Sequence, residues 1–197
     1  MTQVTAYTNE GRYKCLEDLP IDSAELSLGY CGWERCYPGH RFGPNKRTYY
    51  VLHIITNGKG KLEKNGEVFH LTTGDAFLLC PEEEAWYEAD KKEPWAYAWI
   101  GLYGYKVKKV MQYAGFSKEK SIRSLKCTAL LKSYVDEILE VHRLTTEESM
   151  RRNGYLNLFL ATLIEDNEKF NTKTMPEHTY PGTVYVEHAM EYIKHHY

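Results

Sequence analysis

Aromatic side chains cluster in one stretch of the chain, and their spacing places several of them on one side of a strand. Residues 95–99 read Trp-Ala-Tyr-Ala-Trp, so Trp95, Tyr97 and Trp99 recur at a period of two residues. Tyr87 belongs to the preceding apolar segment and can join the same face from a neighbouring strand. Aromatic faces with polar edges suit a sugar, which has C–H patches on its faces and hydroxyls around its rim. We therefore expect a site for a small carbohydrate along this aromatic face.

A sugar site also needs directed hydrogen-bond groups, and three further side chains are candidates for this role. Arg41 or Arg47 would supply a charged donor, and His53 is a weaker candidate. The alternative interpretation is that the aromatic rings only fill a closed core, because small β-barrels are often packed with side chains. Both interpretations stay open at the level of the sequence.

The histidines do not form a recognisable metal-binding motif. His40, His53 and His70 are isolated from one another, and no His-x-His pair occurs among the strands expected below. His195 and His196 are adjacent but stand at the end of the chain. A lone histidine is more often structural or exposed than a metal ligand, so a catalytic metal is not indicated.

The other groups with reactive potential also have structural interpretations. The five cysteines include no Cys-x-x-Cys pair, which favours reduced cytosolic thiols over a zinc or redox site. The acidic run at residues 82–84 is interpreted as a solvated loop. No Gly-x-Ser-x-Gly motif and no phosphate-binding glycine-rich loop supports hydrolase or kinase chemistry. We expect no catalytic residue, no metal and no cofactor.

Residues 49–102 read as short β-strands joined by tight turns. Asn65-Gly66 is the strongest turn signal, because both central residues of a type I′ turn need a positive φ. Pro81 ends a continuous apolar strand at residues 76–80, because proline has no amide hydrogen for the ladder. Many short strands at this spacing predict a β-sandwich or a small barrel.

Beyond Gly104 the apolar spacing becomes helical. One helix is expected over about residues 124–142, and a second over residues 150–164, opened by a capping box at Thr145 and Glu148. The two helices are natural antiparallel neighbours, and the apolar stripe of either one is a candidate for a dimer interface. The alternative is that the helices bury their stripes on each other and on the β-domain, which would leave a monomer. The predicted fold class is α+β, with a β-domain followed by an antiparallel helix pair.

The end of the chain has a different character. Residues 171–182 are polar and contain Pro176, Pro181 and Gly182, which predicts a linker between domains. Residues 183–197 carry one apolar helical face, and an isolated helix of this length is marginal in water. We expect this segment to be the first helix of a further domain.

Motifs between residues 29 and 104 are similar to those of the AraC family of bacterial transcription regulators, in particular members that regulate sugar utilisation in Gram-positive bacteria. The shared motifs are Cys31-Gly32 to Cys36, Pro38-Gly39-His40-Arg41-Phe42-Gly43-Pro44, Arg47 to His53, Gly58-Lys59-Gly60, Gly74-Asp75, Pro81, Tyr87-Glu88-Ala89-Asp90, Pro94-Trp95 and Trp99-Ile100-Gly101. Residues 186–197 resemble the first helix of the family's C-terminal DNA-binding domain. The resemblance implies a cupin-like double-stranded β-barrel that holds a small effector, followed by helices that dimerise the protein.

The resemblance also bears on the site residues. In the family's arabinose-binding member, the positions that match Tyr87, Tyr97 and Trp99 line the effector pocket. Ala85 stands where many members carry a histidine after the turn at Pro81, which is a departure from the family pattern. Two alternative functions remain: a metal-dependent cupin enzyme, and a dimerisation module whose barrel is solid.

The expected organisation has four parts. Residues 1–104 form the cupin-like effector-binding barrel, 105–170 the helical dimerisation subdomain, 171–182 the linker and 183–197 the first helix of a truncated helix-turn-helix DNA-binding domain. The expected partners are a sugar-like effector and a second copy of the chain.

DNA would be bound only through the C-terminal domain absent from this chain, since the formal net charge is −2 and no dense Lys/Arg run occurs. The chain has no signal peptide and no stretch near the ~18 apolar residues of a membrane span, so we expect no membrane contact and a cytoplasmic location.

Overall fold

The computed structural model describes residues 6–170 and Met190, and strands precede helices along most of this length. The elements are β1 (Ala6–Glu10), β2 (Tyr13–Glu17), β3 (Ser27–Arg35), β4 (Arg41–Asn45), β5 (Tyr50–Asn57), β6 (Lys59–Lys64), β7 (Glu67–Thr72), β8 (Asp75–Leu79), β9 (Ala85–Ala89), β10 (Ala96–Tyr103), α1 (Val107–Tyr113), β11 (Ile122–Ser124), α2 (Thr128–Glu140) and α3 (Thr146–Phe170). The expected linker at 171–182 and the expected helix at 183–197 lie outside the described residues, apart from Met190.

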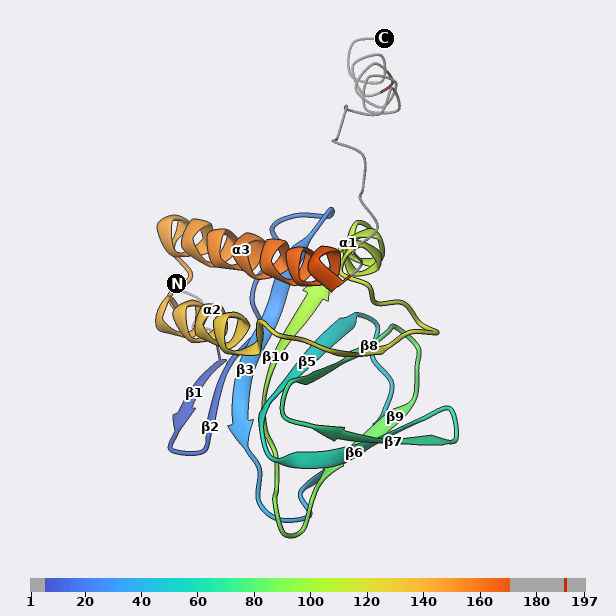
Figure 1. The fold of residues 1–197 in the computed structure, drawn as a ribbon. Coiled ribbons are helices and arrows are strands. Elements are labelled where there is room, and N and C mark those ends of the chain that lie inside the picture. The colour runs from blue at the N-terminus through green and yellow to red at the C-terminus, as the bar shows by residue number, and fades with distance from the viewer. Residues whose placement is uncertain (1–5, 171–189, 191–197) are drawn as a thin grey trace.

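The strands form two antiparallel sheets that face each other (Figure 1). The larger sheet has seven strands in the order β1-β2-β3-β10-β5-β8-β11, and the smaller has four in the order β4-β9-β6-β7. Asn65 and Gly66 both have positive φ and join β6 to β7, as the turn signal predicted. The architecture is a cupin-like β-sandwich with a helical part, which confirms the predicted α+β class.

The central strands of the larger sheet are buried on both faces. On β5, His53 and Ile55 point into the space between the sheets, whereas Leu52 and Ile54 belong to the core on the opposite face. A strand covered on both sides reads as a nearly continuous apolar run, and β5, β8 and β10 have that composition.

Helices α2 and α3 cover the outer face of the larger sheet and run antiparallel to each other (Figure 1). Their apolar stripes share one hydrophobic core with that sheet. The helical residues of this core are Leu131, Val135, Ile138, Leu139, Leu156, Phe159, Leu160 and Leu163. Among the described residues, no helix has the length and apolar character needed to cross a bilayer.

Two details of the helix prediction are wrong. Ser124 lies in β11, because residues 122–124 extend the larger sheet beside β8 and the Ser124 hydroxyl bonds Asp75 at 2.5 Å. The second helix starts next to Thr145 as expected, but the capping box does not form. The Glu148 carboxylate instead accepts the backbone N–H of Arg143 at 2.5 Å and its Nε–H at 2.8 Å.

The acidic run also differs from its interpretation as a solvated loop. Glu82 has a positive φ of 62°, and the turn leaves Glu82 and Glu84 exposed but buries Glu83. Glu83 Oε2 lies 2.9 Å from Lys64 Nζ and accepts the Cys80 backbone N–H at 3.0 Å. Both members of this ion pair are buried, so each depends on the other for compensation of its charge.

We predict that Glu83→Gln lowers the free energy of unfolding by about 3–5 kcal/mol, because the substitution leaves Lys64 charged and buried. Glu84→Gln, one residue away and exposed, is the matched control and should change it by less than about 0.5 kcal/mol. Urea denaturation followed by circular dichroism measures both values. Equal effects of the two substitutions would contradict a stabilising role for the Lys64–Glu83 pair.

Candidate functional site

A cavity of about 210 Å³ opens between the two sheets. Its walls are mostly aromatic, with three charged side chains among them. The lining residues are Tyr13, Glu17, Tyr30, Glu34, Phe42, Asn45, Arg47, Tyr49, His53, Tyr87, Tyr97 and Trp99.

Strands of both sheets position these side chains. In the larger sheet β10 carries Tyr97 and Trp99, and Trp99 lies opposite Gly32 on one neighbour and His53 on the other. In the smaller sheet β9 contributes Tyr87, which pairs with residue 42 of β4. Period-two alternation turns these residues to one face of each strand, as the aromatic pattern predicted.

Five of the seven predicted site residues line the cavity. They are Tyr87, Tyr97, Trp99, Arg47 and His53. The other two lie elsewhere. Trp95 is buried beside the cavity, with its ring 6.3 Å from that of Phe77, and Arg41 stacks its guanidinium on Trp86 at 4.0 Å outside the cavity.

Sequence analysis missed the remaining lining residues, and all of them come from the N-terminal third of the chain. Tyr13 and Glu17 lie on β2, and Tyr30 and Glu34 lie on β3. Gly11 between two short runs is the signal that could have identified the β1–β2 hairpin. The long-range pairing of β3 with β10 has no local signal.

Glycine allows Trp99 to lie close against its own sheet. A Cβ at Gly32 on β3 would lie 2.4 Å from Cζ2 of Trp99, so any other residue at this position would displace the ring. The Tyr13 ring lies 5.8 Å from that of Trp99 at a tilt of 37°. The two rings therefore form one aromatic wall of the cavity.

His53 stands in the wall of the cavity as a neutral imidazole. Its Nε2 lies 3.3 Å from the hydroxyl of Tyr87, and its ring stacks on Phe77 at 4.5 Å. Burial, and secondarily the positive charge of Arg47, hold the pKa of His53 well below its usual value of 6.5. Its Nδ1 is buried and has no hydrogen-bond partner among the described residues.

Tyr87 and Tyr97 stay protonated and serve as hydroxyl donors in the cavity. Burial raises the pKa of Tyr87 to about 12 and raises the pKa of Tyr97 further. The Tyr97 hydroxyl donates to Glu34 Oε2 at 3.0 Å. The cavity thus combines neutral hydroxyls, two carboxylates and one guanidinium, which is a set suited to a polyhydroxyl ligand.

Among the described residues, His53 is the one histidine that lines the cavity. His70 is exposed on β7 and His40 precedes β4, so neither joins His53. The five cysteines are free, and burial raises the pKa of each thiol, which makes them poor nucleophiles.

Comparison with known proteins identifies one family and several relatives of this chain. The family model of the AraC-like ligand binding domain matches residues 27–153, a segment that holds every cavity residue except Tyr13 and Glu17. The chain is 34% identical over 150 residues to the Msm operon regulatory protein of Streptococcus mutans, covering 76% of this chain and 54% of that protein.

Two further relatives match shorter segments. The lactose operon transcription activator of Staphylococcus xylosus is 36% identical, covering 45% of this chain and 31% of that protein. The raffinose operon transcriptional regulatory protein RafR of Pediococcus pentosaceus is 38% identical, covering 47% of this chain and 33% of that protein. The chain spans at most about half the length of these relatives.

Among solved structures, a cupin superfamily protein from Desulfitobacterium hafniense shares 11% identity at a TM-score of 0.36. That match covers 49% of this chain and 82% of the other.

We predict that, because of His53, the free energy of unfolding decreases as the pH is lowered. Because its pKa is lower in the folded state than the unfolded value near 6.5, the unfolded state binds the proton first. The free energy of unfolding should be highest above pH 6.5 and should decrease below it, by at most about 1.4 kcal/mol per pH unit.

Denaturant titrations at pH 7.5, 6.5 and 5.5 measure this slope. His53→Phe keeps a ring on Phe77 but cannot take up a proton, so its slope over this range should be shallower. A slope that is the same in His53→Phe as in the native sequence would contradict the assignment to His53.

Proposed function

The chain belongs to the family of AraC-like ligand binding domains, and from this premise we propose that it is the effector-sensing part of a transcription regulator, with the cavity as its carbohydrate site. Three relatives are named as operon regulators, two of them for lactose and raffinose. Since the chain matches only part of each relative, regulation of transcription is proposed for the longer protein to which such a domain belongs.

The composition of the cavity wall is the observation that carries the carbohydrate proposal. Trp99 and Tyr13 offer ring faces for the C–H patches of a sugar. Arg47 and the carboxylates of Glu17 and Glu34 offer a charged donor and charged acceptors for hydroxyls. Such pairs of stacking and directed polar groups fix both the position and the orientation of a ligand.

The size of the cavity limits what fits inside. A volume of about 210 Å³ is below the roughly 300–1,000 Å³ of typical ligand sites. We propose that one sugar ring occupies the cavity and that any further rings of an oligosaccharide lie outside it.

The alternative of a metal-dependent cupin enzyme has less support. The matched relatives are regulators, and the histidines of the β-domain do not converge on the cavity. We propose that the chain is not an enzyme and that the effector acts by binding alone.

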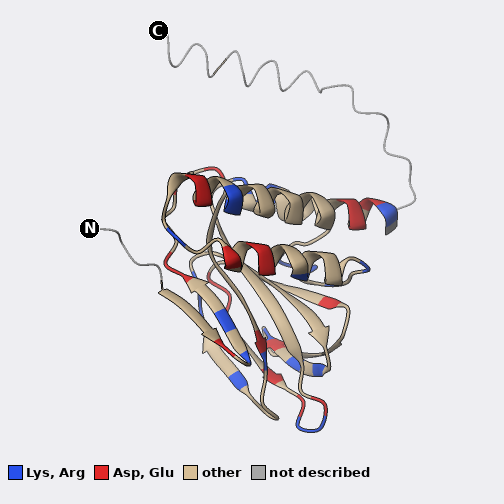
Figure 2. Ribbon diagram, turned by 90° about the vertical axis from the view of Figure 1, so that its left-hand side faces the viewer, with Lys and Arg blue, Asp and Glu red and all other residues tan. Residues whose placement is uncertain are grey.

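We also propose that the chain forms a homodimer. The proposed interface differs from the apolar stripes of the two helices that the sequence suggested for it. Most of each stripe is buried within one chain, against the larger sheet, although Leu130 and Met150 are exposed. A larger uncharged surface lies on α3, where residues 153–164 carry no charge between two charged ends (Figure 2). Gly154, Leu158 and Ala161 are exposed there at helical spacing. We propose this α3 stripe as the contact between two copies.

The remaining parts of the organisation stay proposals. We propose that residues 171–182 link this domain to a DNA-binding domain that begins near residue 183, and that the regulator works in the cytoplasm. Dimerisation would help it read two half-sites, because the second DNA contact becomes intramolecular once the first has formed.

We predict that lactose, raffinose or a monosaccharide component of either binds the 197-residue chain, and that Arg47→Met weakens binding about 10- to 100-fold. The methionine keeps the length of the side chain but removes a charge-assisted hydrogen bond of about 1.5–3 kcal/mol. Arg41→Met is the matched control, since Arg41 lies outside the cavity on Trp86.

Isothermal titration calorimetry measures both affinities. Equal losses in the two variants would contradict the placement of the site. A broad saccharide panel without any binding, together with binding of another ligand class, would contradict the carbohydrate proposal.

We predict that Leu158→Lys shifts the chain from dimer to monomer, because the substitution places a charge in the centre of the α3 stripe. Leu158 is 50% exposed, so the change should not disturb the fold. Val68→Lys on β7, where Val68 is 51% exposed, is the matched control and should leave the dimer intact. Sedimentation velocity at micromolar concentration distinguishes the states, and a native chain that is already monomeric would contradict the proposal.

A further inference from the structure

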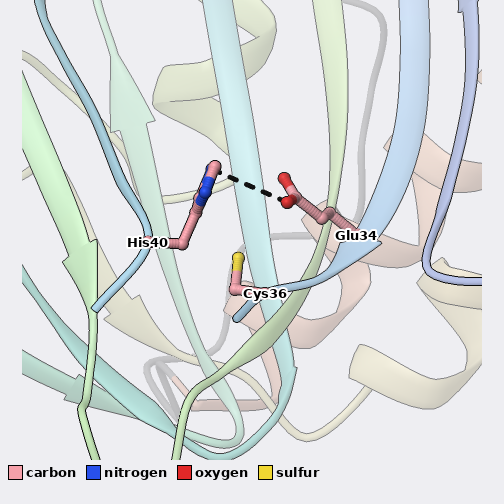
Figure 3. A group of neighbouring side chains, drawn as sticks. All are labelled: Glu34, Cys36 and His40. Atoms are coloured by element: carbon pink, nitrogen blue, oxygen red, sulfur yellow. Dashed lines mark ion pairs between the residues drawn. The ribbon is translucent and has the colours of Figure 1, made fainter. Parts of the chain in front are cut away.

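Three potential metal ligands of different chemistry meet between the end of β3 and the start of β4. Glu34 is on β3, Cys36 follows that strand directly, and His40 precedes β4. One donor atom from each of these side chains lies within 4.8 Å of the other two (Figure 3). This is the one such group of three among the residues that the structure describes.

The backbone holds the segment that carries these ligands in a fixed conformation. The Cys36 N–H donates to the Trp95 carbonyl at 3.1 Å, and the Cys36 carbonyl accepts from Arg12 at 3.0 Å. His40 donates its N–H to the carbonyl of Tyr37 and accepts the N–H of Ala89. Because both ends of the turn are tied in this way, the backbone positions of Cys36 and His40 are fixed before any ligand binds.

We propose that Glu34, Cys36 and His40 bind a divalent transition metal ion, with Zn²⁺ as the ion that suits the set best. A thiolate, an imidazole and a carboxylate are the three ligand types that zinc takes in proteins. In this arrangement Zn²⁺ keeps a fourth position for water or another ligand.

The distance between two of the donors fits this assignment. His40 Nε2 lies 3.6 Å from Glu34 Oε1, which is long for a hydrogen bond (Figure 3). Two N and O ligands bound at about 2.0–2.1 Å to one tetrahedral ion lie about 3.4 Å apart. A small rotation of either side chain therefore brings both donors to a shared ion.

Groups around the three ligands can support them. The Tyr97 hydroxyl donates to Glu34 Oε2, which orients the carboxylate and leaves Oε1 facing His40. The buried indole nitrogen of Trp95, beside Cys36, has no hydrogen-bond partner among the described residues, and a thiolate would be a better acceptor for it than a thiol.

The site has both an entry path and a favourable charge balance. Glu34 and Cys36 line an open groove of about 540 Å³, and the His40 side chain is 38% exposed, so an ion can enter from solvent. A thiolate and a carboxylate together neutralise a divalent ion, which lowers the cost of holding it in a partly buried position.

No sequence pattern predicted this site, because the spacing Glu-x-Cys-x-x-x-His is not a known zinc pattern. Glu34 also lines the aromatic cavity, but Cys36 and His40 do not, and binding of the ion can be measured without a sugar. Failure of this proposal and failure of the carbohydrate proposal are therefore distinguishable.

Titration of the untagged 197-residue chain with CoCl₂ under reducing conditions tests the proposal. His195 and His196 are replaced by Ala in every sample to remove background chelation. We expect one Co²⁺ per chain, with the thiolate-to-cobalt charge-transfer band in the near ultraviolet and the visible bands of tetrahedral cobalt, both abolished by excess Zn²⁺.

Cys36→Ser should abolish the charge-transfer band and weaken Zn²⁺ binding more than about 100-fold, beyond the loss expected for a supporting residue. His40→Ala should weaken Zn²⁺ binding at least about tenfold. The fold should change little, because His40 is partly exposed. Cys127→Ser, at a thiol outside the group of three, is the control and should leave the spectrum unchanged.

A second measurement does not need a folded Cys36 variant. Zn²⁺ should slow alkylation of Cys36 by iodoacetamide in the otherwise native chain, and peptide mass spectrometry reports this for each cysteine. The proposal is wrong if no charge-transfer band forms, if the band survives Cys36→Ser, or if Zn²⁺ protects the other cysteines as much as Cys36.

Discussion

Strand β10 lies in the middle of the seven-stranded sheet, between β3 and β5, and both of its faces are buried. One face carries Tyr97 and Trp99 into the cavity, and the other carries Ala98 and Ile100 into the core under the helices. A strand so placed cannot shift its register, because a slip of one residue would exchange the two faces. Nor can its side chains change size freely, because both faces are closely packed. The cavity and the helix layer are therefore fixed by the same eight residues.

This shared strand also defines how a ligand in the cavity can influence the helices. Neighbouring positions such as Trp99 and Ile100 contact opposite layers, so a displacement of β10 moves both. The N-terminal hairpin makes a second connection, since Tyr13 lines the cavity while Lys14, the next residue, bonds Glu140 at the end of α2 at 2.5 Å. An effector that contacts Tyr13 or Trp99 differently in two arrangements of these layers would change their relative populations.

The sequence was informative where the periodicity of apolar and aromatic residues gave a local signal. Alternation along residues 95–99 identified the aromatic face of β10, and the helical spacing identified α2 and α3. Features that depend on contacts between distant segments could not be read in the same way. Glu83 is buried because Lys64 meets it from β6, and Glu34 reaches the cavity because β3 pairs with β10. Neither pairing leaves a pattern within a window of ten or fifteen residues.

The choice between a solid and a hollow barrel depended on a contact of this long-range kind, and two glycines show why the interior is filled at one end and hollow at the other. Trp95 packs on Gly60, which belongs to β6 in the smaller sheet, so its ring spans the space between the sheets and fills that end. Trp99 packs on Gly32, which belongs to β3 in its own sheet, so its ring lies along the sheet and leaves space in front of it. The same residue type, four positions apart on one face, therefore closes the interior at one end and forms the wall of a cavity at the other.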